Sequence, residues 1–586
     1  MDQLIPSQVK IIDNPDQEEL RELSLKHGLA TMKSYYGNIL KLTRNKARKA
    51  EWTYIIAPPS ESSKYSSKVI TSQQAGELIE QAKKYMVKQE TMIRIDGYIG
   101  IGERAVGVTW FYDLEVSNIA GMQQVLAFPR EIIETPEQLE KPFNNQLTLV
   151  FTAGARAVGM PGDQAIIVDL ENYVTHVIGP DYFGESKKGE LRMFNEYVYQ
   201  RGGLVLHAGA KVVKLAEKKI SVAIMGLSGT GKTTTTFSRQ GEGTEPIQDD
   251  MIALWPDGTF SITENGCFAK TYGLTEQSEP VIYRGTVHPD AWIENVFPNP
   301  DGTYDFSKNI LSPEEVDRLK KMLLLTGSSE ENLNKYISGK VKSSEVVDEY
   351  MIPQDGWDFV VWTQNGRSII PMSAIENAAD FQKLPDLGSL GILNRDEGSD
   401  AATPGIVLFS SPEQAAGYFM LGETSKTSAA GKERGKTRSP FTQPFFPRNY
   451  SLQPVRFKEL LVNFSKLQTW LMNTGYIGGD ARDLELGNAL KVKIRHSSAM
   501  LEALFKNIIK WKLDPDFNYY IVDVDNPENK NLIEQVPVEI LNPYIYFKNN
   551  HREKDYQNWV QKMKEAREKF LKQYNVDPKI IQAVIN

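Results

Sequence analysis

The sequence has a single cysteine, no long hydrophobic run and no excess of basic residues, and each shortage excludes a class of protein. Cys267 stands alone among 586 residues, so no internal disulfide can form and zinc sites built from several cysteines are excluded. No stretch approaches the ~18 consecutive apolar residues of a membrane span. The first residues lack a basic segment followed by an apolar run, so we expect no signal peptide. A cytoplasmic, reducing environment fits these shortages best.

The charge balance argues against nucleic acid as the main partner. The chain carries 67 basic and 75 acidic residues and a formal net charge of -8, whereas binding to a phosphate backbone needs a concentrated positive surface. A local basic pocket for a small anion remains compatible with this balance. Hydrophobic residues at 41% and charged residues at 24% are typical of folded proteins, and the length predicts two or three structural units.

The pattern along the chain predicts mixed secondary structure. Residues 15–90 predict mainly helices, and residues 92–215 contain short β-rich runs. Residues 457–473 predict a helix, and residues 556–574 predict an amphipathic helix whose charged side chains face solvent. The small and basic residues at 422–440 predict a mobile, positively charged loop.

The strongest local signal is a phosphate-binding motif, G-x-x-x-x-G-K-T, at residues 226–233. An apolar, β-branched run precedes it and a Thr-rich helix start follows, which is the strand, loop and helix order that the motif requires. Its glycines let backbone N–H groups turn around phosphate oxygens. Lys232 would reach the β- and γ-phosphates, and the Thr233 hydroxyl would bind magnesium.

Other candidate residues are less specific when taken alone. Asp249 and Asp250 precede an apolar run and could place one carboxylate on a metal and the other behind it, or could form a surface turn. Lys187 and Lys188 form a pair that is usually a solvated surface feature. His207 ends a predicted strand, and a lone histidine is more often structural than a ligand.

The order of these motifs resembles the ATP-dependent phosphoenolpyruvate carboxykinase family. The blocks, in order, are Y-x-G-E-x-K-K-G from Tyr182, a strand ending in His207, GLSGTGKTT from Gly226, and the Asp-Asp pair. Similar blocks follow at residues 264–270, 278–280, 292–296, 366–371, 433–435 and 473–475. The GTP-dependent branch carries a cysteine in the phosphate loop and this chain has none there, so the resemblance favours ATP.

The resemblance implies an α/β fold with α+β elements. An N-terminal mixed α/β domain on the substrate side would span residues 1–215. A C-terminal P-loop mononucleotide-binding domain would span residues 216–586, with an inserted subdomain at about 355–430. The implied activity converts oxaloacetate and ATP to phosphoenolpyruvate, carbon dioxide and ADP in gluconeogenesis, in a monomer or small homo-oligomer with no nucleic-acid or membrane partner.

The resemblance also implies roles for single residues. The implied manganese ligands are Lys188, His207 and Asp250, and Thr233 would bind the second metal, magnesium. The residues implied in catalysis are Lys187, Lys188, Lys232, Asp249 and Arg367. Those implied in substrate binding are Arg44, Tyr182, Asn195, Lys188 and Arg367. Those implied in nucleotide binding are Gly226, Leu227, Ser228, Gly229, Thr230, Gly231, Lys232, Thr233, Thr234, Glu279, Arg367 and Arg434. Lys188 would have to coordinate as the neutral amine, which nearby cations such as Lys187 and desolvation would favour.

Several features depart from the family pattern. Leu42–Lys49 replaces a block like TGRSPKDK, so Arg44 is our choice for the oxaloacetate carboxylate and Arg48 competes with it. Residues 305–350 predict helices with no clear counterpart. The segment after Arg434 differs from the usual adenine-binding loop. Two other functions remain open: a related P-loop kinase that acts on another acceptor, and a nucleotide-binding regulatory paralogue.

Overall fold

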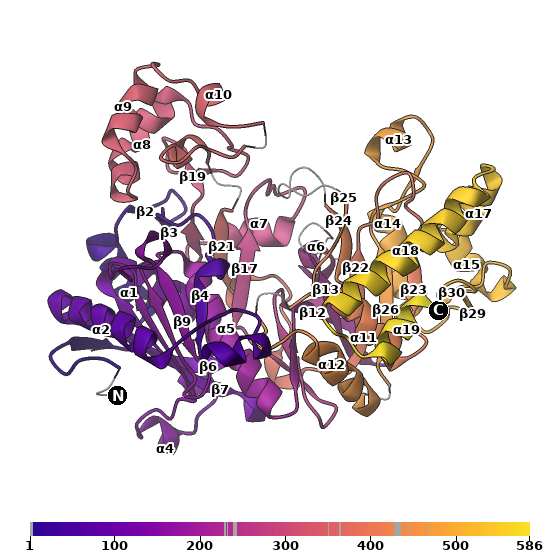
Figure 1. Cartoon of the computed structure of the whole chain (residues 1–586), viewed down its shortest axis with the longest axis horizontal. Helices are drawn as coiled ribbons and strands as arrows, with labels where there is room; N and C mark the ends of the chain where they lie inside the picture. The colour runs from indigo at the N-terminus through magenta and orange to yellow at the C-terminus, as the bar shows by residue number, and fades with distance from the viewer. Residues whose placement is uncertain are drawn as a thin grey trace. The chain divides into compact units, whose positions relative to one another are not determined.

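The computed structural model has a mixed α/β fold (Figure 1), which confirms the predicted class. It describes residues 4–227, 230, 232–237, 243–349, 351–362, 365–426, 435–442, 445–464 and 466–586, without the side chains of Thr233, Thr234 and Lys426. The chain divides into two compact units. Unit 1 comprises Met1–Tyr197, Ile262–Glu376 and Pro444–Arg448, and unit 2 comprises Val198–Ser261, Asn377–Gln443 and Asn449–Asn586. The predicted domain division at residue 215 stays a prediction.

Unit 1 is built on an eight-stranded mixed sheet in the order β1-β6-β7-β8-β10-β9-β4-β5. The strands are β1 (Lys10–Asp13), β4 (Thr53–Ile56), β5 (Lys68–Ile70), β6 (Thr91–Ile99), β7 (Val106–Asp113), β8 (Leu147–Thr152), β9 (Ala165–Asp169) and β10 (Val174–Ile178). Every residue of β7 is buried, as expected for a central strand covered on both faces.

Helices around this sheet follow local sequence signals. The helices are α1 (Gln17–His27), α2 (Ser72–Gln89), α3 (Ser117–Leu126) and α5 (Phe183–Gln200). Thr71 caps α2, and Gln74 completes a capping box, which satisfies two backbone N–H groups at the helix start. The buried residues Ala75, Leu78, Ala82 and Met86 recur at helical spacing along one face of α2.

A second sheet of unit 1 carries several candidate site residues. Its order is β17-β21-β18-β3-β2, and its strands are β2 (Thr31–Lys33), β3 (Ile39–Lys41), β17 (Gly266–Lys270), β18 (Trp292–Glu294) and β21 (Arg367–Pro371). The region predicted to be helical without a counterpart forms α8 (Pro313–Leu325), α9 (Glu330–Ile337) and α10 (Ser343–Val346), which lie together in Figure 1. The helical prediction for this region is confirmed.

Unit 2 contains a second eight-stranded sheet, in the order β14-β12-β13-β22-β26-β23-β30-β29. The strands are β12 (Ala208–Lys214), β13 (Lys219–Gly226), β14 (Thr244–Gln248), β22 (Leu387–Asn394), β23 (Ile406–Leu408), β26 (Gln468–Asn473), β29 (Trp511–Leu513) and β30 (Tyr520–Val522). The three central strands β13, β22 and β26 are parallel. Their carboxyl ends therefore meet at one edge, where open α/β sheets bind ligands.

The helix predicted at residues 457–473 is wrong in its second half. Helix α12 ends at Asn463, and residues from Gln468 form β26. Trp470, Leu471 and Met472 are buried in this strand, which pairs with β22 on one side and β23 on the other. Tertiary strand pairing overrides the local helical pattern here.

The C-terminal helix is confirmed as α18 (Glu553–Gln573), but one of its charged residues does not face solvent. Tyr556, Trp559, Met563 and Leu571 form its buried stripe, and Arg567 lies in the same stripe. The predicted solvation of the charged residues is therefore wrong for Arg567, because its guanidinium has a buried carboxylate partner that offsets its desolvation. None of the helices in the described part of the chain combines the length and apolar character that crossing a membrane requires.

Candidate active site

The predicted phosphate loop follows the central strand of unit 2. β13 ends at Gly226, and helix α6 (Lys232–Phe237) begins six residues later. The Thr230 hydroxyl donates a 2.8 Å hydrogen bond to the Leu227 carbonyl, which tightens the described part of the turn. Ser228, Gly229 and Gly231 lie outside the described residues, as do the side chains of Thr233 and Thr234.

The end of β26 supports this turn from the neighbouring side. The Thr474 hydroxyl donates to the Thr230 carbonyl at 3.0 Å, and the Thr474 N–H donates to the Asn394 carbonyl at 2.7 Å. A Cβ on Gly475 would lie 2.1 Å from the carbonyl oxygen of Asp396. Only glycine fits this close approach, which gives a physical reason for the Asn-Thr-Gly block.

Three predicted residues of unit 2 meet at one carboxylate. The Asp250 Oδ1 atom lies 3.0 Å from His207 Nε2 and 3.9 Å from Lys232 Nζ. His207 follows β11 (Leu204–Leu206), Lys232 begins α6, and Asp250 follows β14. The fold of unit 2 thus brings together residues from three separate segments. Asp249, beside them in sequence, is also buried.

The His207 ring has an orientation that suits metal binding. Its Nδ1 atom lies 3.1 Å from the Phe441 carbonyl oxygen. Because a carbonyl can only accept, Nδ1 carries a proton, and Nε2 is the nitrogen that faces Asp250. A backbone carbonyl on the opposite nitrogen is the usual support of a metal-binding histidine. Within the described part of the chain, no group of three or more His, Cys, Asp or Glu side chains could hold a metal.

In unit 1, the helix α5 buries the predicted lysine pair. The Lys187 Nζ atom lies 2.7 Å from Glu264 Oε1, and both side chains are almost fully buried. Lys187 also lies over the Phe268 ring, 4.8 Å from its centre. The interpretation of the pair as a solvated surface feature is wrong, because both lysines are buried.

Lys188 and Arg48 share one aromatic neighbour in unit 1. Lys188 Nζ is 4.2 Å and the Arg48 guanidinium carbon 5.3 Å from the centre of the Phe445 ring. The face of an aromatic ring attracts cations, so this contact favours the charged form of Lys188.

The two candidate arginines for the substrate carboxylate have different surroundings. Arg44 donates from Nη2 to the Ala153 carbonyl at 2.7 Å, and its Nε lies 3.4 Å from Asp181. Arg48 Nε is buried and has no hydrogen-bond partner among the described residues. A Cβ on Gly184 would lie 3.2 Å from Arg48 Cγ and 2.4 Å from the Tyr182 ring, so Arg48 packs beside Tyr182.

Arg367 begins strand β21 and lies close to further predicted residues. Its guanidinium is 5.4 Å from the centre of the Phe268 ring. Tyr182 accepts a 3.2 Å hydrogen bond from Asn365. Burial raises the pKa of the Tyr182 hydroxyl to about 12, and the charge of Arg367 opposes this rise. Tyr182, Lys187 and Arg367 therefore occupy one region of unit 1.

Sequence reasoning missed Lys270. It lies opposite Arg367 in the β17–β21 pairing, and burial together with Arg367 lowers its pKa to about 8. A lysine with a lowered pKa beside a candidate phosphoryl-binding arginine is a candidate for the same site. It ends the block that begins at Glu264, but only the strand register shows which residue it faces.

The remaining predicted residues are less informative. Asn195 is buried in α5 and donates to the Leu191 carbonyl at 2.7 Å, while its side-chain oxygen has no partner among the described residues. Glu279 is the N-cap residue of α7 (Pro280–Thr286). Arg434 and the rest of residues 427–434 of the predicted basic loop lie outside the described residues. The described ends of that segment are paired strands, β24 (Glu423–Lys426) and β25 (Gly435–Arg438), so the prediction of a loop is wrong there.

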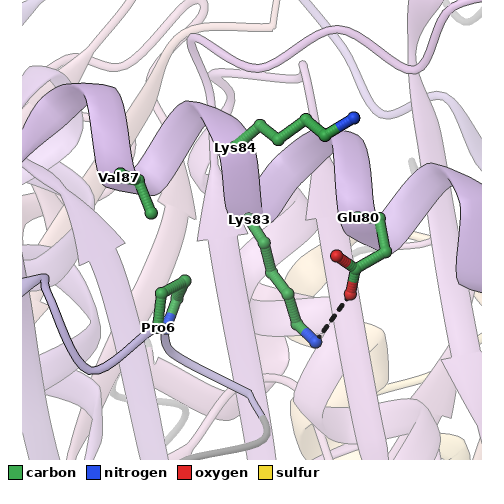
Figure 2. A pocket seen from close by; sticks show the side chains of 5 residues that line it. All are labelled: Pro6, Glu80, Lys83, Lys84 and Val87. Atoms are coloured by element: carbon green, nitrogen blue, oxygen red, sulfur yellow. Dashed lines mark hydrogen bonds and ion pairs between the residues drawn. The ribbon is translucent and has the colours of Figure 1, made fainter.

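A separate open pocket of unit 1 contains none of the predicted residues. It has a volume of ≈ 400 Å³ and is lined by Pro6, Glu80, Lys83, Lys84 and Val87 (Figure 2). Lys83 pairs with Glu80 at 2.9 Å, and Figure 2 shows Lys84 pointing away from this pair. An exposed ion pair between residues three apart on one helix contributes little to stability. Because none of the predicted site residues lines this pocket, we do not consider it a candidate active site.

The strand β13, a glycine-rich segment and the helix α6 follow one another in the order that a phosphate-binding loop requires, within a mixed α/β chain. A family model described as phosphoenolpyruvate carboxykinase matches residues 9–314 and 346–528. The chain therefore belongs to the phosphoenolpyruvate carboxykinase family, which confirms the resemblance. Residues 315–345, which contain most of α8 and all of α9, fall between the matched segments.

Relatives named phosphoenolpyruvate carboxykinase (ATP) are similar at modest identity. The chain is 26% identical over 430 residues to the phosphoenolpyruvate carboxykinase (ATP) of Bradyrhizobium diazoefficiens. It is 26% identical over 430 residues to that of Afipia carboxidovorans and 27% identical over 429 residues to that of Rhodopseudomonas palustris. Each comparison covers 71% of this chain and 66% of the relative.

Proposed function

We propose that this chain is an ATP-dependent phosphoenolpyruvate carboxykinase. It would convert oxaloacetate and ATP to phosphoenolpyruvate, carbon dioxide and ADP, as a cytoplasmic enzyme of gluconeogenesis. The observation that carries the proposal is the meeting of Lys232, Asp250 and His207 in unit 2, in a chain that belongs to this family. A generic kinase needs the lysine and a carboxylate, but it has no need of the histidine.

The proposed reaction needs no covalent bond between the substrates and the protein. The bond between the methylene carbon and the departing carboxylate breaks, and its electron pair forms an enolate. The enolate oxygen then attacks the γ-phosphorus, and ADP leaves. Two anions must approach each other, so the protein mainly orients them and neutralises their charge.

The residues of unit 2 would hold the nucleotide and the metals, in a C-terminal mononucleotide-binding domain. Lys232 would neutralise the β- and γ-phosphates, and Thr233 would bind magnesium. His207 and Asp250 would bind manganese together with Lys188 as the neutral amine. When bound, these ions stabilise negative charge on the enolate and phosphate oxygens. Asp249 would support the metal site, and Arg434 would contact the triphosphate.

The residues of unit 1 would hold oxaloacetate, in the N-terminal substrate domain. Arg367 would contact both the substrate and the transferring phosphoryl group, and Lys187 would add positive charge. Tyr182 would lie against the substrate, with Asn195 near it. Arg44 remains our choice for the oxaloacetate carboxylate, and Arg48 is the competing residue. Two observations support Arg48: its Nε is buried without a hydrogen-bond partner among the described residues, and its side chain packs beside Tyr182.

The remaining nucleotide contacts would come from the phosphate loop and from Glu279. We propose ATP as the nucleotide, manganese and magnesium as the metals, and a monomer or small homo-oligomer as the working form. The relatives at 26–27% identity are named for the ATP-dependent reaction, which supports this choice of nucleotide.

A coupled assay tests the proposal. Purified protein is given phosphoenolpyruvate, bicarbonate, ADP and both metals, and oxaloacetate is detected by its reduction with malate dehydrogenase and NADH. We expect turnover that requires ADP and manganese, and we expect Lys232→Ala to reduce kcat by at least ~10³-fold, because its charge stabilises the transferring phosphoryl group.

Other outcomes would contradict the proposal. ATP hydrolysis or transfer that needs another acceptor would indicate a related P-loop kinase. Tight MgATP binding with no turnover on oxaloacetate would indicate a nucleotide-binding regulatory protein. Full activity of Lys232→Ala would remove the phosphate loop from the mechanism.

A further inference from the structure

The segment that carries both candidate arginines for the substrate carboxylate has no regular secondary structure. Residues 44–49, all of which the structure describes, contain neither helix nor strand. The backbone N–H and C=O groups of such a segment must find partners elsewhere in the protein. The partners of this backbone therefore indicate what fixes the positions of Arg44 and Arg48.

The carboxylate of Asp181 holds the first part of the segment. Its Oδ2 accepts from the backbone N–H of Arg44 at 2.8 Å, and its Oδ1 accepts from the N–H of Asn45 at 2.9 Å. Asp181 is 6% exposed, so these hydrogen bonds lie away from water, where they are stronger. A carboxylate that accepts from two successive N–H groups fixes the course of the backbone at this point.

The side chains of Arg44 and Asn45 reinforce the same attachment. Arg44 Nε lies 3.4 Å from Asp181 Oδ2. The amides of Asn45 and Gln164 exchange two hydrogen bonds, at 3.0 and 3.2 Å, and the Asp181 N–H donates to the Asn45 side-chain oxygen at 3.4 Å. Asp181 and Asn45 therefore hold each other in both directions.

Two further contacts hold the rest of the segment. The Asn365 side chain donates to the Lys46 carbonyl at 2.9 Å. The Lys49 N–H donates to the carboxylate of Glu185 at 2.5 Å, and Glu185 lies in the first turn of α5. The backbone on both sides of Arg48 is therefore attached to the rest of unit 1.

These attachments set where Arg48 lies relative to Tyr182. Tyr182 follows Asp181 directly in the sequence, so the residue that holds the segment is adjacent to the tyrosine assigned to the substrate. A Cβ on Gly184 would lie close to both Arg48 and the Tyr182 ring. Asn365, which holds the middle of the segment, also donates to the Tyr182 hydroxyl at 3.2 Å. The same hydrogen bonds therefore tie the segment and the tyrosine together.

We propose that Asp181 is a positioning residue for oxaloacetate: its carboxylate holds the backbone of residues 44 and 45, so that the segment 44–49 presents its substrate arginine beside Tyr182. This inference rests on the proposed function, which assigns the oxaloacetate carboxylate to an arginine of this segment. It holds for either arginine, because both side chains extend from the backbone that Asp181 fixes.

The role predicts a particular kinetic signature. An arginine on the carboxylate that stays in the product contacts the substrate and the transition state alike. Misplacing this arginine should therefore raise KM for oxaloacetate and leave kcat nearly unchanged. A purely structural role of Asp181 would lower stability without this selective effect.

Three variants of Asp181 test the inference. Asp181→Asn keeps one acceptor oxygen and loses the other together with the charge, so one of the two N–H groups loses its partner. Asp181→Ala removes both acceptors. Asp181→Glu keeps the carboxylate, one methylene farther from the backbone, and is the conservative variant.

The matched control is Asp169→Asn. Asp169 Oδ1 also accepts from two successive backbone N–H groups, those of Glu171 and Asn172, at 3.1 and 3.0 Å. Because β9 and β10 are antiparallel, Asp169 at the end of β9 lies at the edge of the sheet opposite to Asp181, which follows the end of β10. The control therefore alters a similar contact away from the candidate site.

The measurements are kcat, KM for oxaloacetate and for MgATP, the Kd of each ligand by calorimetry, and Tm. We expect Asp181→Asn to raise the KM and the Kd of oxaloacetate about tenfold, and Asp181→Ala to raise them more, because hydrogen bonds that position the charge are lost. The kcat and the Kd of MgATP should change less than about twofold. Asp181→Glu should recover part of the loss, and Asp169→Asn should match the wild type in KM, Kd and kcat.

The outcomes separate this inference from the proposed function. A lower Tm with unchanged KM and Kd for oxaloacetate would mean that Asp181 is only structural, and the inference would be overturned. An equal loss of affinity for both ligands would also overturn it. If Asp181→Ala does not fold, Asp181→Asn and Asp181→Glu decide by the same readout. If the wild type binds oxaloacetate without carboxykinase turnover, and the variants weaken that binding, the inference stands and the proposed function fails. A wild type that does not bind oxaloacetate overturns both.

Discussion

At the scale of single residues, the orientation of the His207 ring determines what its second nitrogen can do. The Phe441 carbonyl accepts from Nδ1, so Nε2 faces Asp250 at 3.0 Å. Two electron-rich atoms at this distance repel unless a proton or a cation lies between them. A metal that binds both atoms would remove this repulsion.

We expect His207→Gln to weaken activation by manganese. Loss of a ligand should raise the manganese concentration that gives half-maximal activity by at least ~10-fold, while the Kd of MgATP measured with saturating magnesium changes little. The matched control is His288→Gln, because His288 is a partly exposed histidine that pairs only with Asp290 among the described residues. An equal loss of nucleotide affinity and metal activation would contradict the assignment.

The two arginines near Tyr182 can be separated by kinetics. If Arg48 binds the oxaloacetate carboxylate, Arg48→Ala should raise KM for oxaloacetate by about 10- to 100-fold, as expected for a charged hydrogen bond. Arg44→Ala should then mainly remove the ion pair with Asp181, and it should change KM for oxaloacetate less than Arg48→Ala does. The reverse order of effects would favour Arg44, and equal effects would mean that both contact the substrate.

At the scale of elements, the helix after the phosphate loop rests on a buried lysine. Lys211 of β12 donates from Nζ to the Thr235 carbonyl in α6 at 2.7 Å. Burial lowers the pKa of Lys211 to about 8, and the unfolded chain would have the ordinary lysine value. The folded state therefore disfavours the charged form, and this penalty reaches about 3 kcal/mol below pH 8.

This lysine predicts a specific pH dependence of stability. As pH rises from about 8 to about 10.5, the folded state loses the proton first, so the wild type should become more stable relative to Lys211→Met. At pH 7 the free energy of unfolding of Lys211→Met should exceed that of the wild type by up to about 3 kcal/mol. The loss of the hydrogen bond to Thr235 would reduce this difference. Chemical denaturation across this range measures the difference, and parallel stability curves would contradict the prediction.

At the scale of the whole molecule, the segment that the family match omits is part of a larger core. Leu323 and Leu333 of this segment pack in one cluster with Leu40, Leu42 and Ile293 of unit 1. The insertion therefore shares its hydrophobic core with the sheet that carries Arg367. Its removal would expose apolar surface on the rest of unit 1.

We expect Leu323→Ala to destabilise unit 1 by about 3 kcal/mol, because it removes a buried side chain and leaves a cavity. The control is Leu325→Ala on the same helix, where the side chain is 43% exposed and the loss should be below about 0.5 kcal/mol. Thermal unfolding measures both, and KM values should not change. Equal stability of the two variants would mean that the insertion is an independent appendage.

The sequence alone determined the family and the mixed α/β class, because these depend on local motifs and on their order. The phosphate loop that it predicts at residues 226–233 stays a prediction. The sequence also indicated the helices at residues 305–350 and 556–574. Short-range patterns such as capping residues and apolar spacing are sufficient for such elements.

Only the tertiary structure decided the features that depend on long-range pairing. Residues 468–473 became a strand because two neighbouring strands pair with them. Lys270 became a candidate because the strand register places it opposite Arg367, and Arg567 became buried because Glu423 receives it. A charged residue in a sequence is expected to face solvent, and only its folded neighbours reveal whether a partner offsets its desolvation.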